Sequence, residues 1–133
     1  MIHAMREETK PWLEKAEENL DTAEYMFKGA RYAPTCFMCQ QTLEILFKAA
    51  VIELAEKRPP KIHDLDRLFK EAGLANFENY KDFLVKASRH YFQVRYPDMV
   101  RYKYNRLVAQ DTLVRTKELF LWIKEQITAK PEK

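Results

Sequence analysis

The chain has 133 residues, of which 47% are hydrophobic and 32% charged, and only two are glycine. This length and composition are typical of one helix-rich globular domain, so we expect a single domain over residues 1–133 with its core over about 11–128. No apolar run is long enough to cross a membrane, and the polar first ten residues exclude a secretory signal peptide. We therefore expect a cytoplasmic protein.

Apolar residues recur at intervals of three and four along almost the whole chain, which is the spacing of one face of a helix. The first stripe predicts a helix over 11–29, with Thr9 as its cap, Pro11 in its first turn and Gly29 at its end. This stripe consists of Leu13, Ala16, Leu20, Ala23 and Phe27.

A second helix is predicted from just after Pro34 to Lys57. Apolar residues cover so much of its surface that it is either the central helix or packs on a partner. Cys36 and Cys39 within it form a C-x-x-C pair, but no second Cys/His pair lies at zinc-ligand spacing and no βαβ pattern surrounds it. We interpret both cysteines as small hydrophobic residues on a buried helix.

The remaining helices follow the two prolines at 59–60. A short helix is expected over 64–72, then a long helix capped by Asn76 that reaches Val94 before Pro97, and a last helix capped by Asp111. The inner face of the last helix consists of Leu113, Thr116, Phe120, Ile123 and Ile127. The fold class is therefore all-α, an antiparallel up-and-down four-helix bundle with one short extra helix.

Charge is distributed unevenly along the chain. Residues 7–24 include seven acidic and two basic residues, whereas residues 86–106 include six basic residues and one acidic residue. Aromatic residues are interspersed in the basic segment, and guanidinium groups with aromatic rings suit phosphates and bases. The alternative is a solvated basic face that balances the acidic first helix, within one chain or across a dimer.

The second helix also carries a polar stripe of Gln40, Gln41, Glu44 and Lys48. Glu44 and Lys48 stand in the favourable order for an i,i+4 ion pair, and spacing alone favours a surface stripe. The other interpretation is a polar wall that faces the basic segment.

The segment 95–98 (RYPD) is more specific. The helix is predicted to break there, which leaves backbone amides free for an anion, and Arg95 offers a planar fork of donors that Asp98 can orient. The alternative is a capped kink with a local ion pair.

Three segments together resemble the HEPN family: 40–49 (QQTLEILFKA), 63–65 (HDL) and 95–98 (RYPD), in the same order and at similar distances. The resemblance covers about residues 11–128. It implies a four- to five-helix bundle that forms a homodimer, without cofactor or metal. HEPN domains are often encoded beside a minimal nucleotidyltransferase, many are proposed to bind nucleotide or nucleic acid, and some are toxins of toxin–antitoxin pairs.

Toxin members are metal-independent ribonucleases in which an Arg holds phosphate and a His, four to six residues later, acts on the ribose hydroxyl or leaving group. Here the corresponding positions after Arg95 are Val100, Arg101 and Tyr102. Tyr102 matches a Tyr of one form of that motif, which puts Val100 at the place of the His. Valine transfers no proton, so no catalytic residue is assigned.

The sequence therefore predicts a homodimeric module that binds nucleotide or RNA phosphate without cleaving RNA. The residues expected to bind the ligand are Arg95, Asp98, Tyr96, Tyr102, Glu44, Lys48, Gln41 and His63. Glu44 is expected within one water-bridged hydrogen bond of Arg95. The competing hypotheses are a ribonuclease toxin that uses His63 or His90, and a non-catalytic helical adaptor whose basic face binds an acidic protein.

Overall fold

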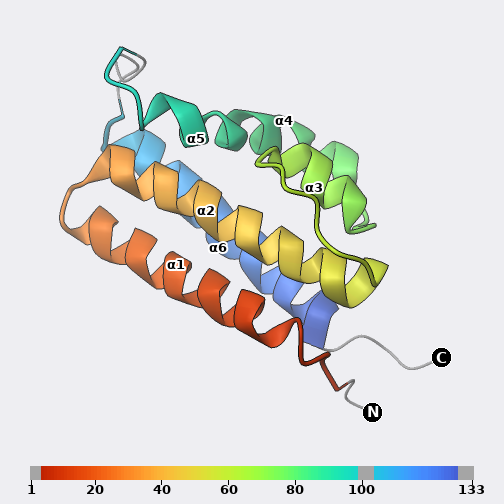
Figure 1. Cartoon of the computed structure of the whole chain (residues 1–133). Coiled ribbons are helices and arrows are strands. Elements are labelled where there is room, and N and C mark those ends of the chain that lie inside the picture. Colours follow the sequence, from red (N-terminus) through yellow and green to blue (C-terminus); the bar gives the residue numbers. More distant parts are fainter. Residues whose placement is uncertain (1–3, 99–103, 129–133) are drawn as a thin grey trace.

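The computed structural model describes residues 4–98 and 104–128, and every regular element in these ranges is helical. Four helical segments, residues 10–28, 32–55, 77–93 and 106–128, lie lengthwise beside one another. The chain reverses direction from each segment to the next (Figure 1). The elements are α1 (Lys10–Lys28), α2 (Tyr32–Ala50), η1 (Val51–Ala55), α3 (Leu65–Glu71), α4 (Phe77–Ser88), α5 (His90–Gln93) and α6 (Arg106–Thr128). The predicted up-and-down bundle with a short extra helix is confirmed, with α3 as the extra helix.

The α2 helix is the central element of the bundle. It packs against α1, α3, α4, α5 and α6, and twelve of its nineteen residues are buried within this one chain. Cys36 and Cys39 are among them, both as free thiols, which confirms their interpretation as small buried residues. Burial raises the pKa of Cys36 to about 11 and that of Cys39 to about 12. The wide apolar surface of α2 is thus covered inside the monomer, and no partner is required to bury it.

Several predicted helix ends are shifted. The α2 helix begins at Tyr32, so Pro34 lies in its first turn, where a missing N–H costs no hydrogen bond. The last helix begins at Arg106 rather than at Asp111, because the Asn105 side chain accepts a hydrogen bond from the Val108 N–H at 2.9 Å.

The two other predicted caps occupy cap positions without capping through their side chains. Asn76 adopts a left-handed conformation before α4. The Thr9 hydroxyl donates to Glu53 Oε1 at 2.9 Å, and the Arg6 N–H donates to the same oxygen at 3.0 Å. Glu53 is fully buried in η1, so this carboxylate holds the start of α1 against the end of α2.

The core surrounds α2 where α1, α3, α4 and α6 meet. Each of the five residues predicted for the inner face of α6 is buried, as are Leu65, Leu68 and Phe69 of α3. The acidic face of α1 pairs with α6, through Glu24 with Lys117 at 3.1 Å and Glu17 with Lys124 at 2.6 Å. None of the described helices has the length and apolarity that a membrane span requires.

Candidate functional site

Three of the four residues in the polar stripe of α2 are buried and Gln41 is half-buried, which corrects the expectation of a surface stripe. Gln40 is fully buried, Glu44 is 6% exposed and Lys48 is 9% exposed. The predicted ion pair is present, with Lys48 Nζ 3.0 Å from Glu44 Oε2. Buried charges are retained where they are paired and hydrogen-bonded, so the surroundings of Glu44 decide what this stripe does.

Glu44 accepts hydrogen bonds from several neighbours. Gln40 Nε2 donates to Glu44 Oε1 at 3.1 Å and also to the backbone carbonyl of His63 at 3.2 Å. His63 Nδ1 lies 3.1 Å from Glu44 Oε2. Because a carboxylate can only accept, Nδ1 carries the proton and Nε2 is left for a ligand.

The position of His63 is fixed by the helix that follows it. The backbone N–H of Leu65, at the start of α3, donates to Ser88 Oγ at 2.8 Å, and that hydroxyl donates to the Leu84 carbonyl at 2.8 Å. A hydroxyl bond to the carbonyl four residues earlier favours a bend, and α4 ends at Ser88. The His63 loop is thereby attached to α4 just before α5, which carries Tyr91.

His63, Tyr91 and Arg95 form a continuous stack. The rings of His63 and Tyr91 lie 4.0 Å apart between centroids at an angle of 15°. Arg95 Cζ lies 4.8 Å from the centroid of the Tyr91 ring and 5.9 Å from that of the Tyr96 ring. We call Glu44, Lys48, His63, Tyr91 and Arg95 the Arg95 cluster. It joins α2, the loop before α3 and α5 into one surface.

The described contacts connect Glu44 to Arg95 through two stacked rings rather than directly. Asp98 is exposed and, within the described ranges, forms no ion pair with Arg95, whose guanidinium contacts rings instead. Gln41 donates to the side chain of Gln40 at 2.7 Å and so belongs to the edge of the cluster. Val100 and Tyr102 lie outside the described residues.

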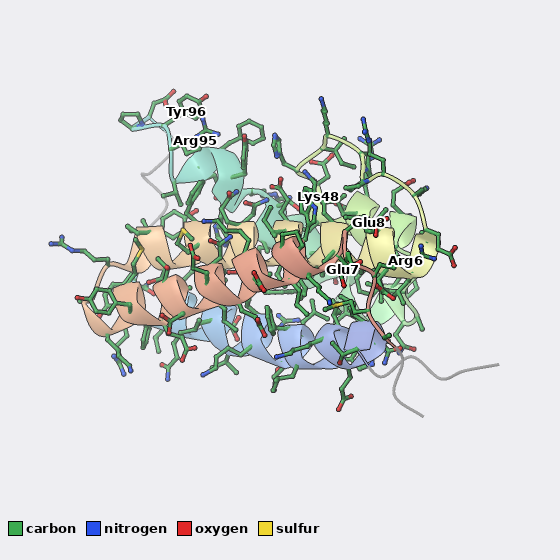
Figure 2. The ribbon with its side chains drawn as sticks, turned by 60° about the horizontal axis from the view of Figure 1, so that its bottom comes forward. Arg6, Glu7, Glu8, Lys48, Arg95 and Tyr96 are labelled. Atoms are coloured by element: carbon green, nitrogen blue, oxygen red, sulfur yellow. The ribbon has the colours of Figure 1, made fainter. Side chains whose placement is uncertain are left out.

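Arg95 and Tyr96 project from one end of the molecule, while Lys48 lies near its middle (Figure 2). Arg95, Tyr96 and the His63 side chain are accessible, the last at 43% exposure. The cluster and the adjoining Tyr96 therefore present a charged fork of donors and an aromatic ring to solvent, beside the buried Glu44–Lys48 ion pair. A guanidinium binds phosphate in two-pronged fashion and aromatic rings stack on bases, so this surface can bind nucleotides.

His90 is excluded from this surface. Its Nδ1 lies 2.7 Å from the Tyr104 hydroxyl, which donates in turn to Gln93 Oε1 at 3.2 Å. Burial, with a smaller contribution from Lys86, lowers the pKa of His90 to about 4. Burial also raises the pKa of Tyr104 to about 12. At neutral pH this imidazole is uncharged, enclosed and already paired.

The ligand-binding residues expected from the sequence did not include Tyr91, a central residue of the cluster. The available signal was its position four residues before Arg95, one helical turn away on the same face. Nor did the sequence indicate a basic cavity at the other end of α2. Among the described residues, no group of three or more His, Cys, Asp or Glu side chains could hold a metal ion.

Comparisons with protein families and with solved structures both point to the HEPN family. The model of the HEPN domain family matches residues 9–126. The crystal structure of TT1696 from Thermus thermophilus is similar with a TM-score of 0.76 and 26% identity, covering 91% of this chain and 99% of that chain. ST0689, described as an archaeal HEPN homologue, shares the fold with a TM-score of 0.72 and 22% identity, covering 90% and 97%. No curated protein matches the sequence significantly.

Proposed function

This chain belongs to the HEPN domain family, and from that premise we propose that it binds nucleotide or RNA phosphate at the Arg95 cluster without cleaving RNA. The observation that carries the proposal is the stack of Arg95 on Tyr91 and of Tyr91 on His63. An exposed guanidinium can bind a phosphate while the exposed Tyr96 ring beside it offers a π-face to a base. Glu44, which is paired with Lys48, holds the His63 ring in position.

The proposal is tested with a fluorescently labelled single-stranded RNA in excess EDTA, by anisotropy. Arg95→Ala should raise the Kd by about ten- to a hundredfold, since a charge-assisted two-pronged contact is lost. Arg115→Ala is the matched control, because Arg115 is also exposed and its Cζ lies 4.5 Å from the Phe83 ring centroid. Equal weakening by both variants would contradict a site at Arg95.

A metal-independent ribonuclease is the second candidate, because the fold brings His63 into the cluster. Its Nδ1 is held by Glu44 and its Nε2 is left for a ligand, the arrangement that a general base needs. Cleavage would require a second proton donor besides this base. We favour binding alone, since the other described histidine, His90, is enclosed.

Gel analysis of the labelled RNA in EDTA decides between these two functions. We expect no turnover from the unaltered protein over hours. Cleavage that disappears in His63→Gln but persists in His90→Gln would establish the ribonuclease and contradict a purely binding role.

We also propose a homodimer, with α6 as the contact surface. Leu107, Val114 and Leu121 follow at intervals of seven residues and are 75%, 48% and 66% exposed. In a two-fold antiparallel pair centred on Val114, Asp111 of one copy would face Lys117 of the other. A stable interface should bury on the order of a thousand Å².

A minimal nucleotidyltransferase, in a toxin–antitoxin-like pair, is the protein partner that we propose. The support is the family membership together with the surplus of basic residues over 86–106. Co-expression with a nucleotidyltransferase from the same gene neighbourhood should yield a complex that survives size-exclusion chromatography. Separate elution of the two proteins at micromolar concentration would contradict this partner.

A further inference from the structure

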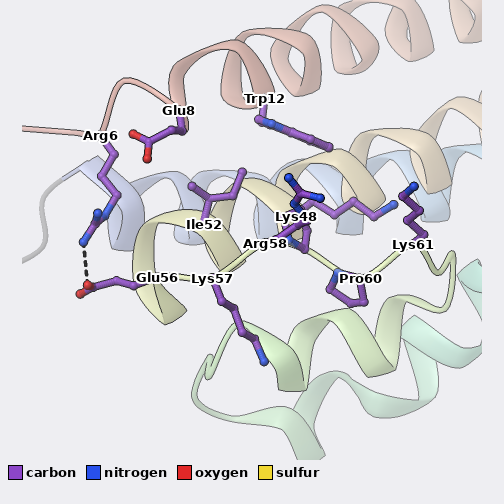
Figure 3. Close-up of a pocket in the computed structure, with 11 residues that line it drawn as sticks. Arg6, Glu8, Trp12, Lys48, Ile52, Glu56, Lys57, Arg58, Pro60 and Lys61 are labelled. Atoms are coloured by element: carbon purple, nitrogen blue, oxygen red, sulfur yellow. Dashed lines mark ion pairs between the residues drawn. The ribbon is translucent and has the colours of Figure 1, made fainter.

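A basic cavity of about 620 Å³ lies at the opposite end of α2 from Arg95. The start of α1, the end of α2 with η1, and the segment 56–61 surround it (Figure 3). Its volume falls within the range of about 300–1,000 Å³ that is usual for small-molecule sites. The lining residues that bear on its ligand are Trp12, Lys48, Ile52, Arg58, Pro60 and Lys61.

The cavity carries an excess of positive charge. Its lining contains five basic and two acidic residues, and one of the acids, Glu56, pairs with Arg6 at 2.8 Å. Lys57 pairs with Glu71, and Lys48 pairs with Glu44, both outside the lining. Arg58 and Lys61 are exposed and, in the part of the chain that the structure describes, form no ion pair. Both are therefore available to an anion.

The sequence explains why Arg58 and Lys61 line the same cavity. They flank Pro59 and Pro60, which fix the backbone and favour an extended conformation in the residue before them. An extended polyproline segment has three residues per turn, so side chains three positions apart point the same way. Glu56, the residue directly after η1, has a left-handed conformation with a φ of 55°, which turns the chain into the extended segment.

Trp12 forms the opposite wall. Its indole faces Lys48, Arg58 and Lys61 across the opening (Figure 3). The buried Glu53 holds Arg6 and Thr9, so the start of α1 and its Trp12 are fixed before any ligand arrives. The indole of Trp12 therefore lies opposite one planar guanidinium and two ammonium groups. This arrangement is complementary to an anion that carries an aromatic ring, rather than to an inorganic anion.

We propose that this cavity binds a nucleoside phosphate, with the base between Trp12 and Arg58 and the phosphate against Lys48 and Lys61. This goes beyond the function proposed for the Arg95 cluster, because the cavity lies elsewhere and shares only Lys48 with it. The nucleoside phosphate is either free or one unit of an RNA.

The test uses Trp12 fluorescence in a Trp122→Phe background, since Trp122 is the second tryptophan and Phe preserves its ring contacts with Phe69 and Tyr80. AMP should quench Trp12 fluorescence with a Kd at least about tenfold below those of adenosine and inorganic phosphate. Only AMP has both a base for the Trp12 ring and a phosphate for the basic side chains. A single-stranded RNA that quenches more strongly than AMP supports the same cavity and identifies RNA as the source.

Two variants locate the site. Arg58→Ala with Lys61→Ala should raise the Kd for AMP about tenfold or more, whereas Lys28→Ala with Lys81→Ala, an equal loss of charge at exposed positions, should leave it unchanged. Arg95→Ala should also leave the quenching by AMP unchanged. The proposal for this cavity and the proposal for the Arg95 cluster can therefore be refuted independently. Absence of quenching at millimolar AMP, or phosphate binding as tightly as AMP, would overturn the proposal.

Discussion

The two described histidines differ in the properties that decide whether an imidazole can act on a ligand. His90 is buried, and its ring is bonded to Tyr104. His63 is accessible, and its Nδ1 is fixed by Glu44, while no hydrogen bond to its Nε2 is found among the described residues. The difference arises from position, since His90 faces the bundle and His63 lies on a loop. The sequence shows that both residues are histidines but does not show this contrast.

Burial of His90 predicts a specific dependence of stability on pH. Its pKa is lowered to about 4 in the folded chain from an ordinary value of 6.5, so between these values the unfolded chain binds more protons. Stability should therefore fall as the pH falls from 6.5 to 4, by on the order of 3 kcal/mol at most from this residue. Urea unfolding at pH 7, 5 and 4 measures this loss.

His90→Gln removes the titrating group and provides the comparison. The variant should be less stable at pH 7, because the Tyr104 contact is disturbed, but should lose less of its remaining stability on acidification. Parallel losses in both proteins would show that His90 is not responsible.

At the scale of elements, the α3–α4 junction positions the site. The Ser88 hydroxyl accepts the first N–H of α3 and bonds to its own helix, which places His63 beside Tyr91. The sequence does not single out Ser88, because a serine near the end of a helix can have many roles. Long-range hydrogen bonds of this kind leave no periodic pattern, so the sequence could not reveal this one.

Ser88→Ala should lower the free energy of unfolding by about 1–3 kcal/mol, since it leaves the buried N–H of Leu65 without its acceptor. RNA affinity should fall as well, because His63 and Tyr91 lose their common attachment. Thr22→Ala is the control, since among the described residues that hydroxyl bonds only to the Glu18 carbonyl of its own helix. Chemical denaturation and anisotropy measure the two effects, and equal effects of both variants would contradict this role of Ser88.

The exposed stripe of α6 provides a second test at this scale. Leu121→Glu should convert a dimer into a monomer in light scattering at micromolar concentration, because it puts a charge into the apolar contact. Tyr25→Glu, at the exposed Tyr25 of α1, should leave the dimer intact. A monomeric unaltered protein, or a dimer that tolerates Leu121→Glu, would refute this interface.

At the scale of the whole molecule, helical periodicity predicted the bundle, since the inner face of α6 is the one that the three- and four-residue spacing indicated. Periodicity did not distinguish a buried polar stripe from an exposed one, because Gln40 and Glu44 have the same spacing in either case. The partners that bury them come from the His63 loop, far along the chain. The cavity at Trp12 also escaped prediction, because α1 and the segment 56–61 meet only in the fold.

The central claim, that RNA phosphate binds at the Arg95 cluster, is tested most directly by NMR of the histidine rings. The Arg58→Ala, Lys61→Ala protein would be titrated with single-stranded RNA, so that the Trp12 cavity does not contribute, and His63→Gln would assign the His63 signals. We expect the ring signals of His63 to shift with saturation while those of the enclosed His90 remain in place. RNA binding that leaves the His63 signals unmoved would contradict the account.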